Sequence, residues 1–252
     1  MIPRIIHQIW LQGYKHIPEE LYKYHITCKD KNHDFFHIFW DANMIRKMLI
    51  KNFGKKFLDL FDSYKVPAQQ ADFARYTILY IYGGIYLDMD MLCRKNLSPF
   101  LNNRLFFTAR NDIFNKIYPM YYTGIIGAIP RHPLFLVVFR NMFSRKEYSD
   151  NIPYSTGTKL FYDSVKEYLD NNYDDITIVD PKYLHPCGVL DDESCPHTCD
   201  QCFVVHTNYS SWSLRLKITK FISKNKFLFL IIFLCTIVIF FGIRSRFRFK
   251  QG

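Results

Sequence analysis

Two aspartates, Asp88 and Asp90, stand two residues apart directly after a short apolar run. Residues two apart at the end of a strand point to the same side of a sheet, so both carboxylates would lie together. Carboxylate oxygens are ligands that Mg²⁺ and Mn²⁺ prefer, and these ions complete their shell with phosphate oxygens and water. The pair therefore predicts a site for a metal-bound diphosphate, although two aspartates at this spacing also occur in solvated turns.

Other features of the same short window make this pair more specific. Asp72 and Arg75 are three residues apart in a segment with helical spacing, which places them on one helix face. Gly83 and Gly84 follow that segment and predict its C-terminal end. Because ligands of open α/β sheets collect at the carboxyl ends of strands, the window predicts one site built from a helix and a strand end.

Apolar runs alternate with segments of helical spacing along the chain. Strands that alternate with helices predict an α/β fold with a mostly parallel sheet. The expected strands are residues 4–11, 35–40, 85–92, 105–109, 124–129, 176–179 and 203–206. The segments with helical spacing are 41–62, 68–82, 132–143 and 158–169, and Pro67 opens the second of them.

The run ADFARYTILYIYGGIYLDMD, residues 71–90, closely resembles the D-x-D sugar-binding segment of a glycosyltransferase family. That family includes fungal α-1,6-mannosyltransferases, inositol phosphorylceramide mannosyltransferases, and α-1,4-galactosyl- and N-acetylglucosaminyltransferases. The opening IPRIIHQIWLQG is similar to the first strand of the family, and HTNYSSW is similar to its C-terminal segment. The resemblance covers about residues 2–213, with the three motifs in the family's order.

This resemblance implies a single Rossmann-like GT-A domain over residues 1–213. It implies an enzyme that transfers a sugar from a nucleotide-sugar donor with retention of anomeric configuration, with Mn²⁺ or Mg²⁺ as the cofactor. GDP-mannose is the favoured donor, with a UDP-sugar as the alternative. The acceptor is expected to be a glycan or a glycolipid, such as an inositol phosphorylceramide.

Matching the motifs position by position assigns the site. Asp90 matches the direct metal ligand, and Asp88 matches the carboxylate that contacts ribose or sugar, often through water. Asp72 and Arg75 match the pair that binds the hydroxyls of the donor sugar. The other matches are Trp10 near the nucleobase, His206 as a further metal or diphosphate ligand, and Ser211 with Trp212 near the diphosphate.

Three assignments are weaker on the residues themselves. Trp10 lies in an apolar run and is also consistent with a core position, and His7 is predicted to be a core histidine rather than a ligand. The segment STGTKL, residues 155–160, resembles a family loop that usually reads TGP. Because the proline is absent here, no role is carried over to this segment.

The formal net charge of +10 belongs to the C-terminal part of the chain. Nine of the 33 lysines and arginines lie at or after Arg215, whereas no Asp or Glu follows Asp200. Residues 1–214 are therefore close to neutral, which argues against a nucleic-acid partner. The segment FLFLIIFLCTIVIFFGI, residues 227–243, is apolar and flanked by basic residues, which predicts a membrane helix in a C-terminal anchor, residues 214–252.

The cysteines and the termini point to different compartments. In a reducing cytosol the cluster Cys187, Cys195, Cys199 and Cys202 would form a structural Zn²⁺ site, whereas in an oxidising lumen it would form two disulfides. The N-terminal residues lack a signal-peptide pattern, which favours a tail-anchored protein facing the cytosol. The family resemblance instead implies the Golgi or another endomembrane, so the side of the membrane stays open. Cys28 and Cys93 are isolated in the sequence.

Two other function classes compete with the glycosyltransferase. One is a non-catalytic, tail-anchored membrane protein that retains a nucleotide-sugar-binding fold, against which the intact acidic motif argues. The other is a nucleotidyltransferase, which uses paired carboxylates but does not need Trp10, Asp72 and Arg75. For a glycosyltransferase, the lack of an obvious protein nucleophile favours front-face attack by the acceptor, and a two-carboxylate double displacement is the alternative.

Overall fold

The computed structural model describes residues 1–110, 118–171, 174–188, 195–207, 209 and 225. The chain divides into two compact units, residues 1–208 and residues 209–252. The expected membrane helix at 227–243, and also Ser211 and Trp212, lie outside the described residues. Among the residues that are described, no helix is long and apolar enough to cross a bilayer. The domain boundary at residue 213 stays a prediction.

The first unit is built on a six-stranded sheet with the order β2-β1-β3-β6-β5-β7. Strands β1, β2 and β3 run parallel, β5 and β7 run parallel, and β6 runs against both of its neighbours. The expected α/β class with a mostly parallel sheet is therefore confirmed. The bounds are β1 (Ile5–Ile9), β2 (Phe36–Trp40), β3 (Gly84–Leu87), β5 (Leu105–Ala109), β6 (Tyr121–Ala128) and β7 (Ile176–Val179).

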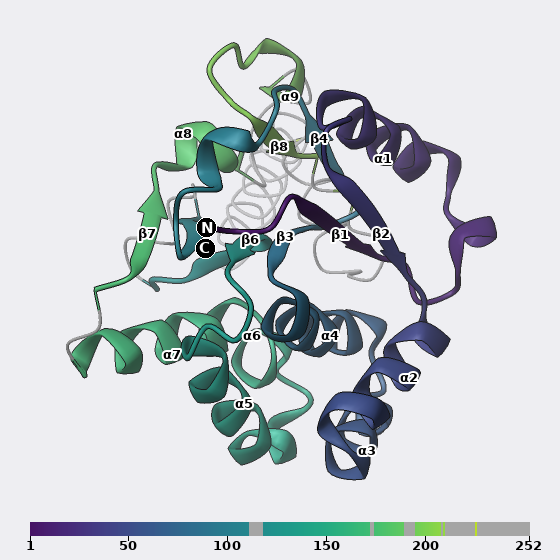
Figure 1. Ribbon diagram of the computed structural model, residues 1–252, viewed down its shortest axis with the longest axis vertical. Coiled ribbons are helices and arrows are strands. Elements are labelled where there is room, and N and C mark those ends of the chain that lie inside the picture. The colour runs from purple at the N-terminus through teal and green to yellow at the C-terminus, as the bar shows by residue number, and fades with distance from the viewer. Residues whose placement is uncertain (111–117, 172–173, 189–194, 208, 210–224, 226–252) are drawn as a thin grey trace, which may run out of the picture. The chain divides into compact units, whose positions relative to one another are not determined.

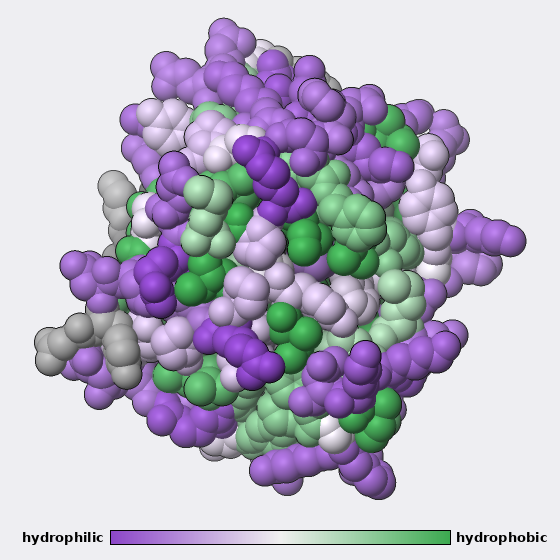
Figure 2. All heavy atoms as spheres, viewed as in Figure 1, coloured by the Kyte–Doolittle hydropathy of each residue, from purple (hydrophilic) through white to green (hydrophobic). Residues whose placement is uncertain are grey.

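Helices cover both faces of this sheet (Figure 1). One face packs against α2 (Ala42–Phe53), α3 (Lys55–Ser63), α4 (Pro67–Tyr82), α5 (Leu134–Ser144) and α7 (Thr158–Asp170). The other face packs against α1 (Glu19–Lys31), α8 (Pro181–Leu184) and a small antiparallel sheet of β4 (Met91–Cys93) and β8 (Val204–His206). The remaining short helices are α6 (Ile152–Ser155) and α9 (Cys195–Thr198). In Figure 2, hydrophilic side chains border the viewed face and apolar ones gather near its centre.

The segment 41–62 forms two helices instead of one. Asp41 caps α2 by accepting a hydrogen bond from the backbone N–H of Met44 at 2.8 Å. Gly54 separates α2 from α3 with a φ of 77°, a conformation that glycine adopts without steric cost. The helical spacing over 41–62 was therefore confirmed, but the break at Gly54 was not predicted.

The expected strand 85–92 is wrong in one respect that matters for the site. The strand ends at Leu87, residues 88–90 form a turn, and β4 then begins at Met91 in the small sheet. The backbone N–H of Met91 donates to the carbonyl of Asp88 at 3.3 Å, which closes the turn. Asp88 and Asp90 therefore lie in a turn between two sheets, and not two apart along one strand.

Candidate active site around the paired aspartates

Helix α4 delivers Asp72 and Arg75 to the sheet on its buried face, where their exposed fractions are 6% and 5%. Gly83 ends the helix, and Gly84 begins β3 with a φ of 91°. A Cβ at Gly84 would lie 2.6 Å from the carbonyl oxygen of Ile5, so only glycine lets β3 pack this closely beside β1. The glycine pair therefore fixes the position of α4 relative to the aspartate turn.

Arg75 joins the helix to the turn. Its Nη2 lies 3.0 Å from Asp72 Oδ1 and 3.2 Å from Asp88 Oδ1, and its Nη1 donates to the carbonyl of Thr123 at 2.7 Å. The guanidinium also sits 4.6 Å above the ring of Tyr86. A planar fork of donors suits contact with two carboxylates, which is why arginine rather than lysine fits this position.

Asp88 is held on the same oxygen from a second direction. The hydroxyl of Tyr86 donates to Asp88 Oδ1 at 2.6 Å. Its carboxylate is 26% exposed, compared with 8% for the side chain of Asp72, so Asp88 lies nearer to solvent. A Cβ at Gly124 would lie 2.1 Å from the hydroxyl of Tyr122 and 2.7 Å from Asp88 Oδ2, so a side chain at this position would displace both groups.

Strand β8 brings His206 to Asp90 from far along the chain. Met91 pairs with His206 in the small sheet, and His206 Nε2 lies 2.9 Å from Asp90 Oδ2. The backbone N–H and the hydroxyl of Thr207 both donate to the carbonyl of Asp90, at 3.0 Å and 2.9 Å. Both partners of the Asp90–His206 pair keep part of their side chain exposed, at 14% and 18%.

The Asp90–His206 pair fits a divalent cation that is bound mainly by its substrate. A carboxylate oxygen and an imidazole nitrogen already lie within 2.9 Å of each other, and both are ligands that Mn²⁺ accepts. In the part of the chain that the structure describes, no three His, Cys, Asp or Glu side chains converge on one point. A cation whose coordination shell is completed by a diphosphate and water needs only a few ligands from the protein.

The structure thus brings together five of the eight residues that the sequence singled out. Asp72, Arg75 and Asp88 form one contact chain, and Asp90 with His206 forms a second at the other end of the same turn. The five are Asp72, Arg75, Asp88, Asp90 and His206. Their chemical roles stay predictions.

Trp10 follows the carboxyl end of β1 and is half-buried. Its indole N–H donates to the carbonyl of His16 at 2.9 Å, so this polar group is used within the chain. His7 is a core histidine, as expected: Trp40 donates to His7 Nδ1 at 3.1 Å, and His7 Nε2 lies 2.8 Å from the carbonyl of Gly83. Burial lowers the pKa of His7 to about 4, so the ring is neutral near pH 7.

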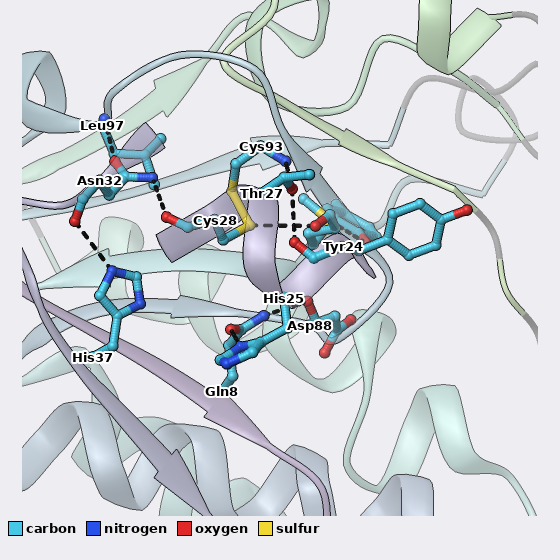
Figure 3. Close-up of a disulfide and its surroundings, with 12 residues drawn as sticks. Gln8, Tyr24, His25, Thr27, Cys28, Asn32, His37, Asp88, Cys93 and Leu97 are labelled. Atoms are coloured by element: carbon cyan, nitrogen blue, oxygen red, sulfur yellow. Dashed lines mark hydrogen bonds between the residues drawn. A yellow bond between two sulfur atoms is a disulfide. The ribbon is translucent and has the colours of Figure 1, made fainter. Parts of the chain in front are cut away.

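A buried polar link that the sequence did not indicate lies behind the aspartate turn (Figure 3). Gln8 of β1 donates to the carbonyl of Asp88 at 3.4 Å, and its Oε1 lies 2.6 Å from His25 Nδ1. Gln8 is 1% exposed and His25 is 4% exposed. The one local signal was a glutamine inside the apolar run of residues 4–11, which nothing nearby in the sequence connects with the turn.

A disulfide between Cys28 and Cys93 joins α1 to β4, the strand that follows the aspartate turn (Figure 3). The interpretation of these two cysteines as isolated was therefore wrong, because 65 residues separate them and the spacing carries no sign of the contact. Both side chains are buried, at 0% and 2% exposed. The bond fixes one end of the turn that carries Asp90.

Of the two alternatives for the second cysteine group, the structure contradicts the zinc site. Cys187 and Cys195 form a disulfide, which removes two of the four thiolates that the ion would need. Cys199 and Cys202 are thiols in the structure, and Cys202 Sγ lies 3.2 Å from the carbonyl of Cys199. One of the two disulfides expected in an oxidising compartment is therefore present.

Loss of the long-range disulfide should cost more stability than loss of the short one. A disulfide lowers the conformational entropy of the unfolded chain and so raises its free energy. The expected rise is about 4 kcal/mol for a bond across 65 residues and about 2.5 kcal/mol for one across 8 residues. We expect the Cys28→Ala/Cys93→Ala double variant to unfold at a lower denaturant concentration than the Cys187→Ala/Cys195→Ala variant. Chemical denaturation measures both, and the reverse order would show that the Cys28–Cys93 bond is not the main constraint.

Comparisons with known proteins place these features in a family. The family model described as "Glycosyltransferase sugar-binding region containing DXD motif" matches residues 18–107, which include Asp72, Arg75 and the Asp88–Asp90 pair. An uncharacterized glycosyltransferase of Acanthamoeba polyphaga mimivirus is 53% identical over 233 residues, or 92% of each chain. Among solved structures, PaToxG glycosyltransferase superposes with a TM-score of 0.50 at 17% identity, covering 68% of this chain and 71% of that one.

Fungal relatives match a shorter part of the chain. A mannosyl phosphorylinositol ceramide synthase of Saccharomyces cerevisiae is 38% identical over 160 residues, which are 62% of this chain and 39% of the yeast protein. Inositol phosphoceramide mannosyltransferase 3 of Schizosaccharomyces pombe is 34% identical over 157 residues, or 62% and 41%. The matched region thus spans about two fifths of the length of these fungal proteins.

Proposed function

The chain belongs to the glycosyltransferases whose sugar-binding region contains the DXD motif, and from that premise we propose that it transfers mannose from GDP-mannose to a glycolipid. The proposed acceptor is an inositol phosphorylceramide, the lipid class named in the fungal relatives. A UDP-sugar donor and a glycan acceptor are the alternatives. The observation that carries the proposal is the turn with Asp88 and Asp90, held between Arg75 on one side and His206 on the other.

In this proposal Asp90 and Asp88, at the two ends of the turn, have different roles. Asp90 and His206 hold Mn²⁺ or Mg²⁺, and the ion neutralises the charge that develops on the departing nucleoside diphosphate. Asp88 lies nearer to solvent than Asp72 and contacts the ribose or the sugar. Trp10, at the carboxyl end of β1, is proposed to lie near the nucleobase, and Ser211 and Trp212 near the diphosphate.

Asp72 and Arg75 are proposed to bind the donor sugar as a unit. The Nη groups of Arg75 contact two carboxylates and one backbone carbonyl, so its main task is to fix those carboxylates toward the sugar hydroxyls. Both oxygens of Asp72 already accept contacts, Oδ1 from Arg75 and Oδ2 from Thr156. A carboxylate held in this way is poorly placed as a nucleophile, which favours front-face attack with retention over a double displacement.

We infer the compartment of the protein from its two disulfides. Disulfides persist in oxidising compartments, and the Cys28–Cys93 and Cys187–Cys195 bonds therefore favour an endomembrane lumen such as that of the Golgi. Attachment through residues 227–243 would keep the site close to lipid head groups, where a glycolipid acceptor lies. The acceptor and the anchor are thus mutually consistent.

A donor screen with the full-length chain in detergent tests the proposed function. Four donors, GDP-mannose, UDP-galactose, UDP-glucose and UDP-N-acetylglucosamine, are each supplied with Mn²⁺ and inositol phosphorylceramide, and the lipid product is weighed by mass spectrometry. We expect addition of one hexose from GDP-mannose. Binding of a nucleotide-sugar without hydrolysis or transfer would instead support the non-catalytic binding protein, and label from the nucleotide in the product would support a nucleotidyltransferase.

The activity should fall in acid as Asp72 takes up a proton. Burial raises the pKa of Asp72 to about 6, against the opposing effects of the Arg75 charge and the Thr156 hydroxyl. Arg75 binds the carboxylate form, so activity should be full well above pH 6 and decline as the pH falls through 6. The pH profile of kcat/KM for the donor measures this. In Asp72→Asn, which cannot titrate, the residual activity should lack this inflection, and its persistence would assign it to another group.

A further inference from the structure

Residues 155–157, which we call the joint, connect α6 to α7 and pack against α4. The resemblance to the family assigns no role to them. This joint holds part of the segment STGTKL, whose match to the family loop lacks the proline. Ser155 and Thr156 are fully buried. In Figure 1, α6 lies between α4 and α7, so the joint reaches the helix that carries Asp72 and Arg75.

Gln69 and Tyr76 anchor the joint through hydrogen bonds that do not involve the Thr156 side chain. Gln69 donates to the hydroxyl of Ser155 at 3.1 Å and to the carbonyl of Ser149 at 2.9 Å. The hydroxyl of Tyr76 donates to the backbone carbonyl of Thr156 at 3.2 Å. The backbone N–H groups of Thr156 and Gly157 also donate to the carbonyl of Ile152, at 3.1 Å and 3.0 Å, so the backbone here has several anchors besides the Thr156 hydroxyl.

The Thr156 hydroxyl is directed at the site. It donates to Asp72 Oδ2 at 2.9 Å, a shorter contact than its 3.4 Å approach to the carbonyl of Ile152. The other oxygen of Asp72 faces Arg75 at 3.0 Å, so the two contacts grip the carboxylate from opposite ends. A Cβ at Gly157 would lie only 3.3 Å from Asp72 Oδ2, which shows how closely the joint passes over this oxygen.

We propose that Thr156 is a positioning residue, whose hydroxyl fixes the plane of the Asp72 carboxylate for contact with the donor sugar. The inference rests on the proposed function, because it acts through the donor contact assigned to Asp72. With only Arg75 holding it, the carboxylate can rotate about its Cβ–Cγ bond, and its outer oxygen loses a fixed direction. Small misplacements of a positioning group lower the rate strongly even when the fold is intact.

The test uses three variants of the full-length chain. Thr156→Val removes the hydroxyl and keeps the shape, whereas Thr156→Ser keeps the hydroxyl. Thr77→Val is the matched control, because Thr77 is a fully buried threonine of α4 whose hydroxyl donates to the carbonyl of Ala74 at 2.9 Å. For each variant, kcat and KM for the donor are measured together with the thermal midpoint of unfolding.

We expect Thr156→Val to lower kcat/KM for the donor by about tenfold to a hundredfold, the scale of one hydrogen bond to a charged group. Thr156→Ser should stay within about threefold of the wild type, and Thr77→Val should leave kcat/KM unchanged while losing some thermal stability. Equal activity of Thr156→Val and the wild type would overturn the inference alone. If the valine and serine variants lost activity equally, and their thermal midpoints fell by a matching amount, Thr156 would have only a structural role.

The wild-type measurement separates this inference from the proposed function. If the wild-type chain turns over a donor, the three variants decide the role of Thr156 by themselves. If it turns over none of the four donors, the proposed function fails, and the inference about Thr156 fails with it.

Discussion

Replacement of Asp90 by alanine should lower Mn²⁺-dependent turnover of the donor by about a thousandfold. The carboxylate is one of the two side chains proposed to hold the ion, and its Oδ2 lies 2.9 Å from His206 Nε2. Loss of a metal ligand removes the charge that stabilises the departing diphosphate, which is worth several kcal/mol in the transition state. The same variant should bind Mn²⁺ weakly in the presence of the nucleoside diphosphate, as titration calorimetry would record.

Asp62→Ala is the matched control for this prediction. Asp62 is an aspartate of α3 whose Oδ1 accepts from Arg46 at 2.8 Å, with 41% of its side chain exposed. It should leave both turnover and Mn²⁺ binding unchanged. If Asp90→Ala kept activity within a few-fold of wild type, the ion would have to be held elsewhere, and the roles given to Asp90 and His206 would be wrong.

The local part of the site was predictable because helix geometry fixes it. Asp72 and Arg75 are three residues apart, and every helix puts such a pair on one face. The end of α4 at Gly83 and Gly84 was equally predictable, because glycine adopts positive φ angles without steric cost. What the pattern did not indicate is that Arg75 also reaches Asp88, since that contact depends on where β3 returns beside the helix.

The error over residues 85–92 has a physical cause. Apolar and polar side chains keep alternating through Asp88 and Asp90, so the period of two continues across the turn. The change from β3 to β4 is set by the partners, β1 and β6 for the first strand and β8 for the second. Pairing with β8 is a contact over more than a hundred residues, and no local pattern records it.

The remaining gaps are of the same long-range kind. His206 was placed by resemblance to a family, and nothing in its own surroundings marks it as a neighbour of Asp90. The Gln8–His25 link and the Cys28–Cys93 bond each connect distant segments behind the turn. Thr156 was passed over because its motif lacks the family's proline, although its hydroxyl reaches Asp72.

Replacing Arg75 by alanine should lower the free energy of unfolding by about 3–5 kcal/mol and abolish donor turnover. Arg75 is 5% exposed and contacts both Asp72 and Asp88, so its loss leaves the buried carboxylate of Asp72 and the partly exposed one of Asp88 without their counter-charge. Because such a loss is a large fraction of the stability of a typical domain, the variant should fold but melt early. Chemical denaturation and a donor turnover assay measure the two effects on the same preparation.

Arg75→Lys separates the charge from the geometry. An ammonium keeps the counter-charge for one carboxylate but cannot extend a planar fork to Asp72, Asp88 and the Thr123 carbonyl together. We expect it to recover part of the stability and little of the turnover. Arg46→Ala, which breaks the exposed pair with Asp62, should cost at most about 1 kcal/mol and leave turnover unchanged. Full activity in Arg75→Lys would mean that the site needs only a positive charge at this point, and the argument that Arg75 fixes two carboxylates in one geometry would fail.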